Sequence, residues 1–207
     1  MRTILVTGFG PFPGAPFNPT EALVRRLAKL RRWNLRLVPH VFETSYAAVD
    51  RELPPLIAKH KPDALLMFGL HGRAKTLRIE TLARNSIGRV RDVSGTTPKN
   101  HSISPGAAHI KMASPGSRLA RAARRAGVPA VMSRDAGHYL CNYLCWRGTE
   151  TAKAQDLRIA AFIHVPPIGR KTLRRKSHIL TPAGLERAAG AILAELVHCL
   201  GSGAVRH

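Results

Sequence analysis

Short apolar runs that alternate with helical segments constrain the fold of this chain more than any other feature. Apolar or β-branched runs occupy residues 3–7, 35–42, 63–69, 128–133 and 157–165, and each is short enough to be a strand. Segments with helical periodicity or helix-start signals separate most of these runs. Because strands that alternate with helices build parallel sheets, we expect an α/β fold with a mostly parallel sheet covered on both faces.

Capping residues indicate where the helices begin. Asn18 is a good N-cap and is followed by proline at the first helical position, which predicts a helix that ends near Arg32. A second helix is expected over residues 45–60, with an interruption at Pro54-Pro55. Further helices are expected at 115–126, 136–149 and 181–200.

The middle of the chain combines a strand with a long loop. Residues 77–85 alternate in polarity, which predicts a strand with Glu80 on the face opposite Leu77 and Ile79. Residues 86–114 are rich in Gly, Pro, Ser, Thr, Asn and His and have no sustained period. Loops of this length in compact domains are usually lids or binding loops. A second, basic loop is expected at 168–179.

Length and composition favour a single domain, spanning residues 1–207, that does not enter a membrane. With 44% hydrophobic residues, the chain can bury one substantial core. Its apolar runs are far shorter than the roughly 20 residues of a membrane-spanning helix, and residues 1–7 lack the apolar core of a secretory signal. Three cysteines, an odd number, fit a reducing compartment. We therefore expect a cytoplasmic location.

The charge balance is strongly basic: 33 Lys and Arg against 12 Asp and Glu give a formal net charge of +21. Basic chains can bind nucleic acids, but the clusters at 25–32 and 118–125 alternate with apolar residues at helical spacing, which is typical of solvated helix faces. A third cluster lies at 170–176. Because only 5% of residues are aromatic, little surface is available for base stacking. We expect nonspecific nucleic-acid binding at most, and a basic nucleic-acid-binding protein remains an alternative.

Reactive side chains are predicted at strand ends, where open α/β sheets bind their ligands. Cys141 lies near the start of a helix that follows a strand, where the positive end of the helix dipole stabilises a thiolate. His164 is the last polar residue of an apolar strand and is expected to emerge at the sheet edge, while Glu80 is a lone carboxylate on another strand. Such a set can supply a nucleophile, its base and the group that orients the base.

Each of these residues also has a purely structural explanation. Cys141 could be a small buried hydrophobe, His164 a hydrogen-bonded core histidine and Glu80 a surface acid paired with arginine. His138 precedes Cys141 and Cys145 at helical spacing, but three ligands on one helix match no standard zinc pattern, so no metal site is expected. The spacing alone leaves these alternatives open.

Four blocks of sequence, spread over nearly the whole chain, carry a resemblance to a known family. They are Thr7-Gly-Phe-Gly-Pro-Phe12 with Asn18-Pro-Thr20; Gly72-Arg73 with Ile79-Glu80 and Ala83-Arg-Asn85; Asp135-Ala-Gly-His-Tyr-Leu-Cys-Asn-Tyr143; and Phe162-Ile-His-Val-Pro166. In this order the blocks resemble the pyroglutamyl peptidases of type I, or pyrrolidone-carboxyl peptidases. The resemblance implies a three-layer α/β/α sandwich with a mostly parallel central sheet. It also implies a cysteine peptidase that removes N-terminal pyroglutamyl groups from peptides, needs no cofactor, is cytoplasmic and commonly forms homo-oligomers.

Position by position, the resemblance implies roles for individual residues. Cys141 corresponds to the nucleophile, His164 to its base and Glu80 to the acid that orients the base. The residues implied to bind substrate are Phe9, Phe12, Asn18, Tyr139 and Arg89. The aromatic side chains among them would wall the lactam ring, and the arginine would lie near the oxyanion.

The chain departs from the family pattern at two places beside the implied site. Leu70 stands where the family usually has Gln within a longer glycine-rich turn, and Thr81 stands where it usually has Arg after the acid. The three implied catalytic residues are all present. The departures leave a related cysteine amidohydrolase with a different substrate as an alternative to the peptidase.

Overall fold

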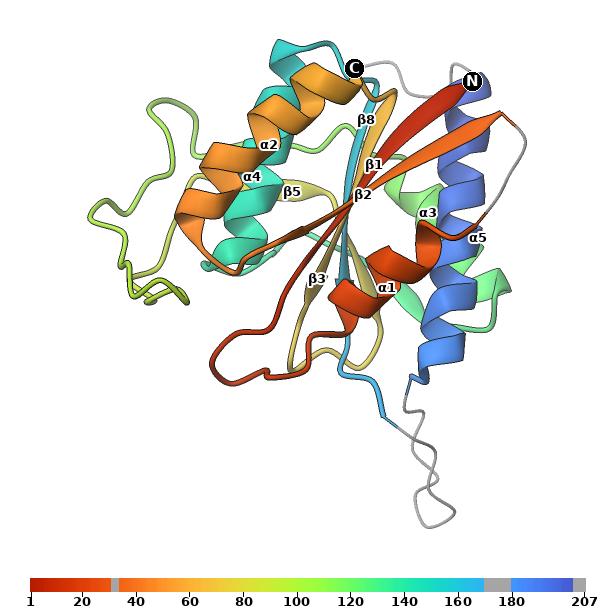
Figure 1. Cartoon of the computed structure of the whole chain (residues 1–207), viewed down its shortest axis with the longest axis horizontal. Coiled ribbons are helices and arrows are strands. Elements are labelled where there is room, and N and C mark those ends of the chain that lie inside the picture. Colours follow the sequence, from red (N-terminus) through yellow and green to blue (C-terminus); the bar gives the residue numbers. More distant parts are fainter. Residues whose placement is uncertain (31–33, 170–179, 203–207) are drawn as a thin grey trace.

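The computed structural model describes residues 1–30, 34–169 and 180–202, and its centre is a six-stranded sheet with helices on both sides (Figure 1). In spatial order its strands are β2 (Leu35–Phe42), β1 (Arg2–Phe9), β3 (Ala64–Leu70), β8 (Ile159–Val165), β4 (Leu77–Glu80) and β7 (Ala130–Ser133). Strands β5 (Leu82–Arg84) and β6 (His109–Lys111) form a separate antiparallel pair. The helices are α1 (Pro19–Leu27), α2 (Tyr46–His60), α3 (Gly116–Arg125), α4 (Leu140–Ala154) and α5 (Pro182–Gly201). The predicted α/β class with a mostly parallel sheet is confirmed.

Strand direction divides the large sheet into two parts. Neighbours among β2, β1, β3 and β8 are parallel, whereas β4 runs antiparallel to β8 and parallel to β7. Because β4 runs against β8, Glu80 at its C-terminal end pairs with Phe162, and Arg78 pairs with His164. The expectation that the candidate residues all reach one edge of a parallel sheet is therefore wrong for β4.

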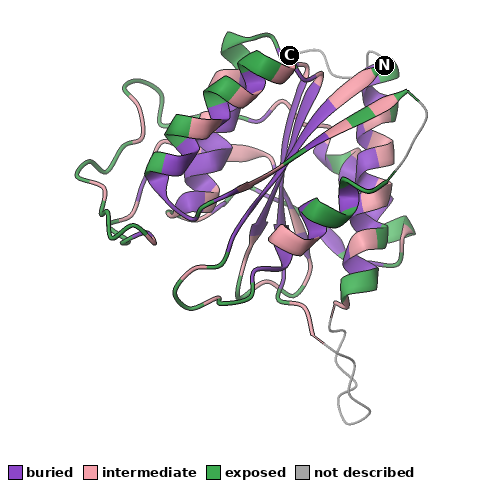
Figure 2. Cartoon of the chain, in the orientation of Figure 1, coloured by how far each residue is buried: buried purple, intermediate pink, exposed green. Residues whose placement is uncertain are grey.

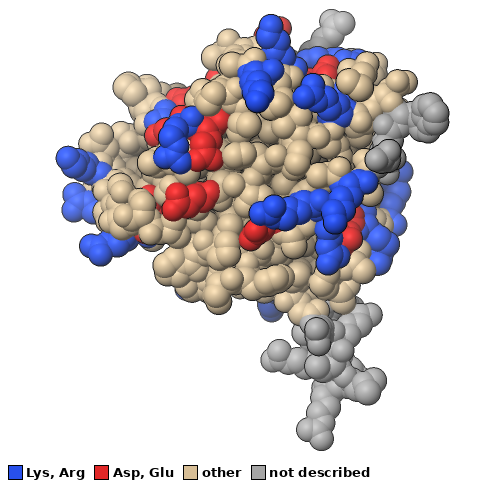
Figure 3. All heavy atoms as spheres, in the orientation of Figure 1, with Lys and Arg blue, Asp and Glu red and all other residues tan. Residues whose placement is uncertain are grey.

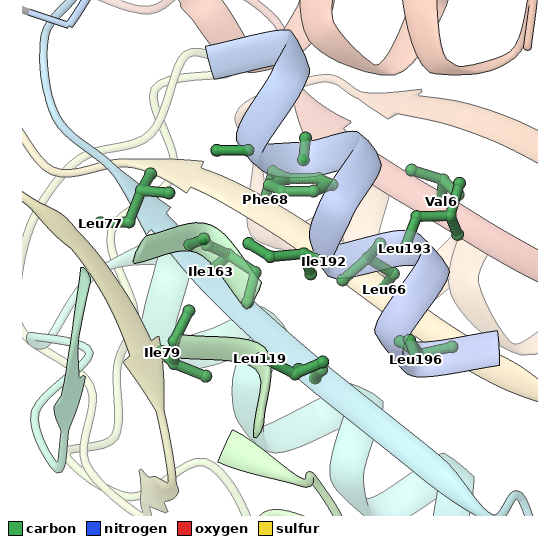
Figure 4. Close-up of a cluster of buried hydrophobic side chains, with 14 of the residues drawn as sticks. Val6, Leu66, Phe68, Leu77, Ile79, Leu119, Ile163, Ile192, Leu193 and Leu196 are labelled. Atoms are coloured by element: carbon green, nitrogen blue, oxygen red, sulfur yellow. The ribbon is translucent and has the colours of Figure 1, made fainter. Parts of the chain in front are cut away.

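Two hydrophobic cores lie on opposite faces of the sheet, and the central strands β1, β3 and β8 between them are almost entirely buried, whereas the edge strands β2 and β7 are partly exposed (Figure 2). One core joins α1, α3 and α5 to side chains such as Val6 and Leu66; Figure 4 shows part of it, with Leu119 of α3 and Ile192 of α5 against the strands. The other core joins α2 and α4 to residues such as Met67. Side chains alternate between the faces along each strand, so a continuous apolar run serves both cores.

The strand predicted over residues 77–85 is two strands in different sheets. The chain leaves the large sheet at Thr81, whose N–H and hydroxyl both donate to the Ser133 carbonyl, at 2.8 and 2.9 Å. β5 then pairs with β6, which lies inside the segment 86–114 that was predicted to be loop throughout. Both strands are three residues long, too short for side-chain alternation to reveal them.

The interruption of α2 that was predicted at Pro54 and Pro55 does not occur. Pro54 and Pro55 are exposed, and the helix continues through them. Leu53 and Ile57 on either side are buried. Packing of this apolar face against the sheet therefore outweighs the backbone hydrogen bonds that the prolines remove.

Two other helix boundaries differ from expectation. α4 begins at Leu140 rather than at residue 136, because Gly137 has a φ of +80°, outside the helical region, and it ends at Ala154, beyond the expected 149. α1 ends at Leu27; the end predicted near Arg32 falls at residues 31–33, outside the described residues.

Arginines of α1 and α3 pair with acidic side chains of the neighbouring helix α5. Arg118 of α3 donates to Glu195 of α5 at 2.6 Å, and Arg26 of α1 pairs with Glu186 of α5. Figure 3 shows Lys and Arg spread over this face of the molecule, with acidic groups beside several of them. The basic loop predicted at 168–179 lies mostly outside the described residues. Within the described part of the chain, no helix is long and apolar enough to cross a membrane.

Candidate active site

The three residues predicted to be reactive come together where β4, β8 and α4 meet. Cys141 is the second residue of α4, His164 is the last but one of β8, and Glu80 is the last of β4. The structure thus joins side chains from three elements that are far apart in the sequence.

Glu80 and His164 form a buried pair. The His164 Nδ1 and Glu80 Oε1 atoms are 2.8 Å apart, and the two residues are 2% and 0% exposed. As predicted, Glu80 lies on the face opposite Leu77 and Ile79, which pack in the α3 and α5 core. His164, however, does not emerge into solvent at the sheet edge as expected, because α4 covers this end of β8. A surface acid paired only with arginine is excluded by the burial of Glu80.

His164 also lies beside Cys141, whose charge acts on the imidazole. Burial by itself lowers the pKa of His164, but the charge of Cys141, its hydrogen bond and the bond to Glu80 outweigh burial and raise the pKa to about 9. The Cys141 Sγ lies 3.9 Å from the Leu70 carbonyl oxygen at the end of β3. The imidazole of His164 therefore holds a proton at neutral pH.

Gly69 is required for this arrangement and was not singled out from the sequence. A Cβ at this position would lie 2.7 Å from Cys141 Sγ and 2.6 Å from a ring carbon of Phe162. Only the absence of a side chain lets the thiol rest against β3. A glycine near the end of a buried strand is a known sign of close approach, and this signal was available in the sequence.

The first turn of α4 is anchored by Asn142, the residue after the cysteine. Its Oδ1 accepts from the Arg84 N–H at 3.0 Å, and its Nδ2 donates to the carbonyls of Arg84 and Ser86 at 2.9 and 2.8 Å. The side chain is completely buried. The short strand β5 thus fixes where α4 begins, and with it the position of Cys141.

Two of the residues implied to bind substrate, Phe12 and Tyr139, face each other near the start of α4. The rings of Phe12 and Tyr139 have centroids 6.4 Å apart, and both residues are partly exposed. Tyr139 immediately precedes α4, and Phe12 lies in a turn closed by paired hydrogen bonds with Ala15. These rings are available to a ligand.

Phe9, Asn18 and Arg89 are placed differently from the two exposed rings. Phe9 is 2% exposed and packs on Phe42, with ring centroids 6.0 Å apart. Asn18 is buried, accepts from the Thr20 N–H as the N-cap of α1 and donates to the Gly10 carbonyl at 3.0 Å. Arg89 is exposed, and no hydrogen bond within the described residues joins its side chain to Cys141. Phe9 and Asn18 therefore support the loop that carries Phe12, and the role of Arg89 stays a prediction.

Neither of the other two cysteines is arranged like Cys141. Cys145 is completely buried, and burial raises the pKa of its thiol well above the usual value, with Glu80 and Cys141 acting in the same direction. Cys199 is buried in α5. The His138 ring lies 3.0 Å from the Ser86 hydroxyl. Across the described residues, no group of three or more His, Cys, Asp or Glu side chains is arranged to hold a metal ion.

Two cationic or titratable side chains flank the buried pair and were also not singled out. Arg78 Nε lies 3.6 Å from Glu80 Oε1, and the His71 ring packs edge-on against His164 with centroids 5.1 Å apart. Burial, followed by the charges of His164 and Arg78, lowers the pKa of His71. Sequence spacing could not reveal either contact, because both depend on how β4 and the β3–β4 turn lie against β8.

Comparisons with known proteins agree on one family. The sequence profile described as "Pyroglutamyl peptidase" matches residues 2–197. The pyrrolidone-carboxylate peptidase of Thermococcus litoralis is 31% identical over 169 residues, 80% of this chain and 77% of the relative, and that of Oceanobacillus iheyensis is 30% identical over 190 residues, 91% and 96%. The solved pyrrolidone carboxyl peptidase of T. litoralis superposes with a TM-score of 0.89 at 25% identity, covering 98% of this chain and 96% of that chain. Pyroglutamyl peptidase I of Bacillus amyloliquefaciens superposes with a TM-score of 0.83 at 27% identity, covering 93% and 95%.

Proposed function

The chain belongs to the pyroglutamyl peptidase family, and from that premise we propose that it removes N-terminal pyroglutamyl groups from peptides, with Cys141 as nucleophile, His164 as base and Glu80 as the residue that orients His164. The observation that carries this proposal is the buried, hydrogen-bonded pair of Glu80 and His164 beside the Cys141 thiol. A cysteine, its histidine base and an acid that orients the base form the arrangement that activates a thiol for attack on an amide.

Glu80 selects which nitrogen of His164 takes part in catalysis. Because Nδ1 faces the carboxylate at 2.8 Å, Nε2 is the nitrogen available to the thiol. The raised pKa of His164, about 9, means that the ring holds a proton at neutral pH and can give it to the departing amine.

The reaction proceeds through a thioester. The thiolate attacks the pyroglutamyl carbonyl carbon, and the resulting oxyanion lies near the first N–H groups of α4, which have no partners within the helix and point toward negative charge. The C–N bond then breaks as His164 gives its proton to the departing amine. A water molecule, deprotonated by His164, attacks the thioester, which releases pyroglutamate and restores the thiol.

The aromatic side chains that line the proposed site suit a neutral lactam ring. A pyroglutamyl group has no ammonium, so it can enter a site lined by rings without the cost of desolvating a charge. Phe12 and Tyr139 supply such rings beside Cys141. Phe9 and Asn18 hold the loop of Phe12 in place from the buried side, and we propose Arg89 as a contact near the oxyanion.

A comparison of three fluorogenic amides tests the function. The purified chain should release a coumarin fluorophore from the pyroglutamyl amide with a kcat/KM far above that for the prolyl and glutamyl amides. The prolyl amide is the matched control, because it differs from the substrate in lacking the ring carbonyl and in carrying a charged nitrogen. Equal or faster cleavage of the prolyl amide would assign the same triad to a different amide.

We also propose that the peptidase works as a homo-oligomer in the cytoplasm. Exposed Val131 and Met132, 46% and 57% exposed on the edge strand β7, support association, because exposed apolar edge strands readily pair or become covered. Its three cysteines are free thiols, which suits a reducing compartment. Light scattering after size exclusion, compared with a Val131→Lys/Met132→Lys variant, tests the first statement, and cell fractionation tests the second.

A further inference from the structure

Glu80 is a buried carboxylate, and only one of its two oxygens has a hydrogen-bond partner among the described residues. It is 0% exposed, its Oε1 faces His164 Nδ1, and its Oε2 has no hydrogen-bond partner among the described residues. A buried ion is stable only when it is paired. His164 is a cation only while it holds its second proton, and the proposed reaction requires it to give that proton to the leaving amine.

Arg78 is placed to be the permanent counter-charge. It is the cross-strand partner of His164 in the antiparallel β4–β8 pair, and two residues before Glu80 it lies on the same face of β4. Its Nε is buried, has no hydrogen-bond partner in the described part of the chain and lies 3.6 Å from Glu80 Oε1. An arginine remains charged throughout the catalytic cycle.

Ser133 on the neighbouring strand holds the guanidinium there. Arg78 Nη2 donates to the Ser133 hydroxyl at 2.7 Å, and Ser133, which pairs with Glu80 in the parallel β4–β7 ladder, is itself buried. The Arg78 side chain is 31% exposed, so without this bond it could turn toward water. The other titratable groups packed around Glu80 are His164 on β8, His71 on the β3–β4 turn, and Cys141 and Cys145 on α4.

We propose that Arg78, anchored by Ser133, is a positioning residue that supplies the fixed positive charge for Glu80 and so allows His164 to release its proton during the reaction. This inference rests on the proposed peptidase function. With Arg78 present, the carboxylate keeps a cation when the imidazole becomes neutral. Without it, Glu80 depends on the imidazolium for its positive partner and retains the proton on His164 more strongly.

The experiment measures the titration of His164 directly, without substrate. Protein with ¹⁵N-labelled histidine is titrated by NMR, and the His164 signal is assigned by its loss in a His164→Ala variant. Arg78→Gln removes a positive charge near the ring, so it should raise the pKa of His164 by about one pH unit. Arg78→Lys keeps the charge and should leave that pKa at the wild-type value. Ser133→Ala should give an intermediate shift, because Arg78 is loosened but not removed. Arg36→Gln, on the opposite edge strand β2, is the matched control and should change nothing.

Activity gives a second readout. The kcat of Arg78→Gln toward the pyroglutamyl amide should fall roughly tenfold, with recovery in Arg78→Lys. The inference is overturned if the pKa of His164 in Arg78→Gln is unchanged or lowered. It is also overturned if Arg78→Lys raises that pKa as much as Arg78→Gln does. A wild-type chain that cleaves no pyroglutamyl amide would instead overturn the proposed function, and the NMR titration would still decide the role of Arg78.

Discussion

Gly69 and Cys141 approach so closely that a Cβ on residue 69 would lie 2.7 Å from the cysteine Sγ. The same Cβ would lie 2.6 Å from the Phe162 ring, which is completely buried and cannot retreat. The thiol is the only one of the two neighbours that can move away. The position of the proposed nucleophile therefore depends on a glycine that has no reactive side chain.

Gly69→Ala should lower kcat roughly 100-fold, because a displacement of about 1 Å at a reacting atom costs that much. Gly72→Ala is the matched control from the turn that follows β3: a Cβ there meets nothing within 4 Å, so its activity should equal that of the wild type. Steady-state kinetics on the pyroglutamyl amide measure both variants. Full activity in Gly69→Ala would show that the thiol does not need this contact.

Cys141→Ser should abolish amidase activity, whereas Cys145→Ala and Cys199→Ala should keep most of it. Cys145 is buried and its thiol pKa is raised well above the usual value, so it cannot serve as a nucleophile near neutral pH. Iodoacetamide should therefore modify Cys141 first, as peptide mass spectrometry can establish. Selective inactivation through Cys145 would contradict the assignment of the nucleophile.

The His164 ion pair should make stability fall at alkaline pH. The pKa of His164 is raised from 6.5 to about 9 in the folded state, so its stabilisation is fully present below about pH 6.5 and is lost as the pH rises through about 9. Cys141→Ser removes the charge and the hydrogen bond of Cys141 that help to raise the pKa of His164, so that variant should lose less stability between about pH 6 and about pH 9.5. Urea unfolding of both proteins gives the difference, which should be on the order of 1–3 kcal/mol. Parallel pH dependence in the two would contradict the ion pair.

Tyr139→Ala and Phe12→Ala should each reduce kcat/KM for the pyroglutamyl amide roughly tenfold, because each removes an apolar wall of the proposed lactam site. The effect should fall mainly on KM. Phe17→Ala is the matched control, since Phe17 lies in the same loop and is 62% exposed. Losses in Phe17→Ala equal to those of the other two would point to damage of the loop rather than to a missing wall.

DNA binding, if present, should be independent of sequence and should weaken steeply with salt, because counterion release drives such binding. Surface arginines of α1 and α3 are engaged with acids of α5, and added DNA should leave the amidase rate unchanged. Anisotropy titrations with two unrelated duplexes at low and high salt measure this. Salt-resistant preference for one duplex would favour the nucleic-acid-binding alternative.

The regular elements could largely be predicted from the sequence, because local patterns mark them. The runs that became β1, β2, β3 and β8, and the Asn18 cap of α1, were expected from apolar periodicity and capping alone. The split after Glu80 and the strand β6 were missed, since hydrogen bonds to Ser133 and Asn142 from distant elements decide them. The resemblance singled out Cys141, His164 and Glu80, but not Gly69, Arg78 or Asn142, which support them.

The sequence by itself determined the fold class, the family and the candidate set of reactive side chains, because short-range periodicity and recognisable motifs carry that information along the chain. Only the tertiary structure decided that β4 runs antiparallel to β8, which brings Glu80 beneath His164 and Arg78 beside both. Strand direction in a sheet is set by connections and packing between distant segments, so no local pattern records it. For the same reason, only the tertiary structure shows that Glu80 is buried and needs a positively charged partner. Only the tertiary structure shows that Cys141 approaches β3 so closely that residue 69 must be glycine.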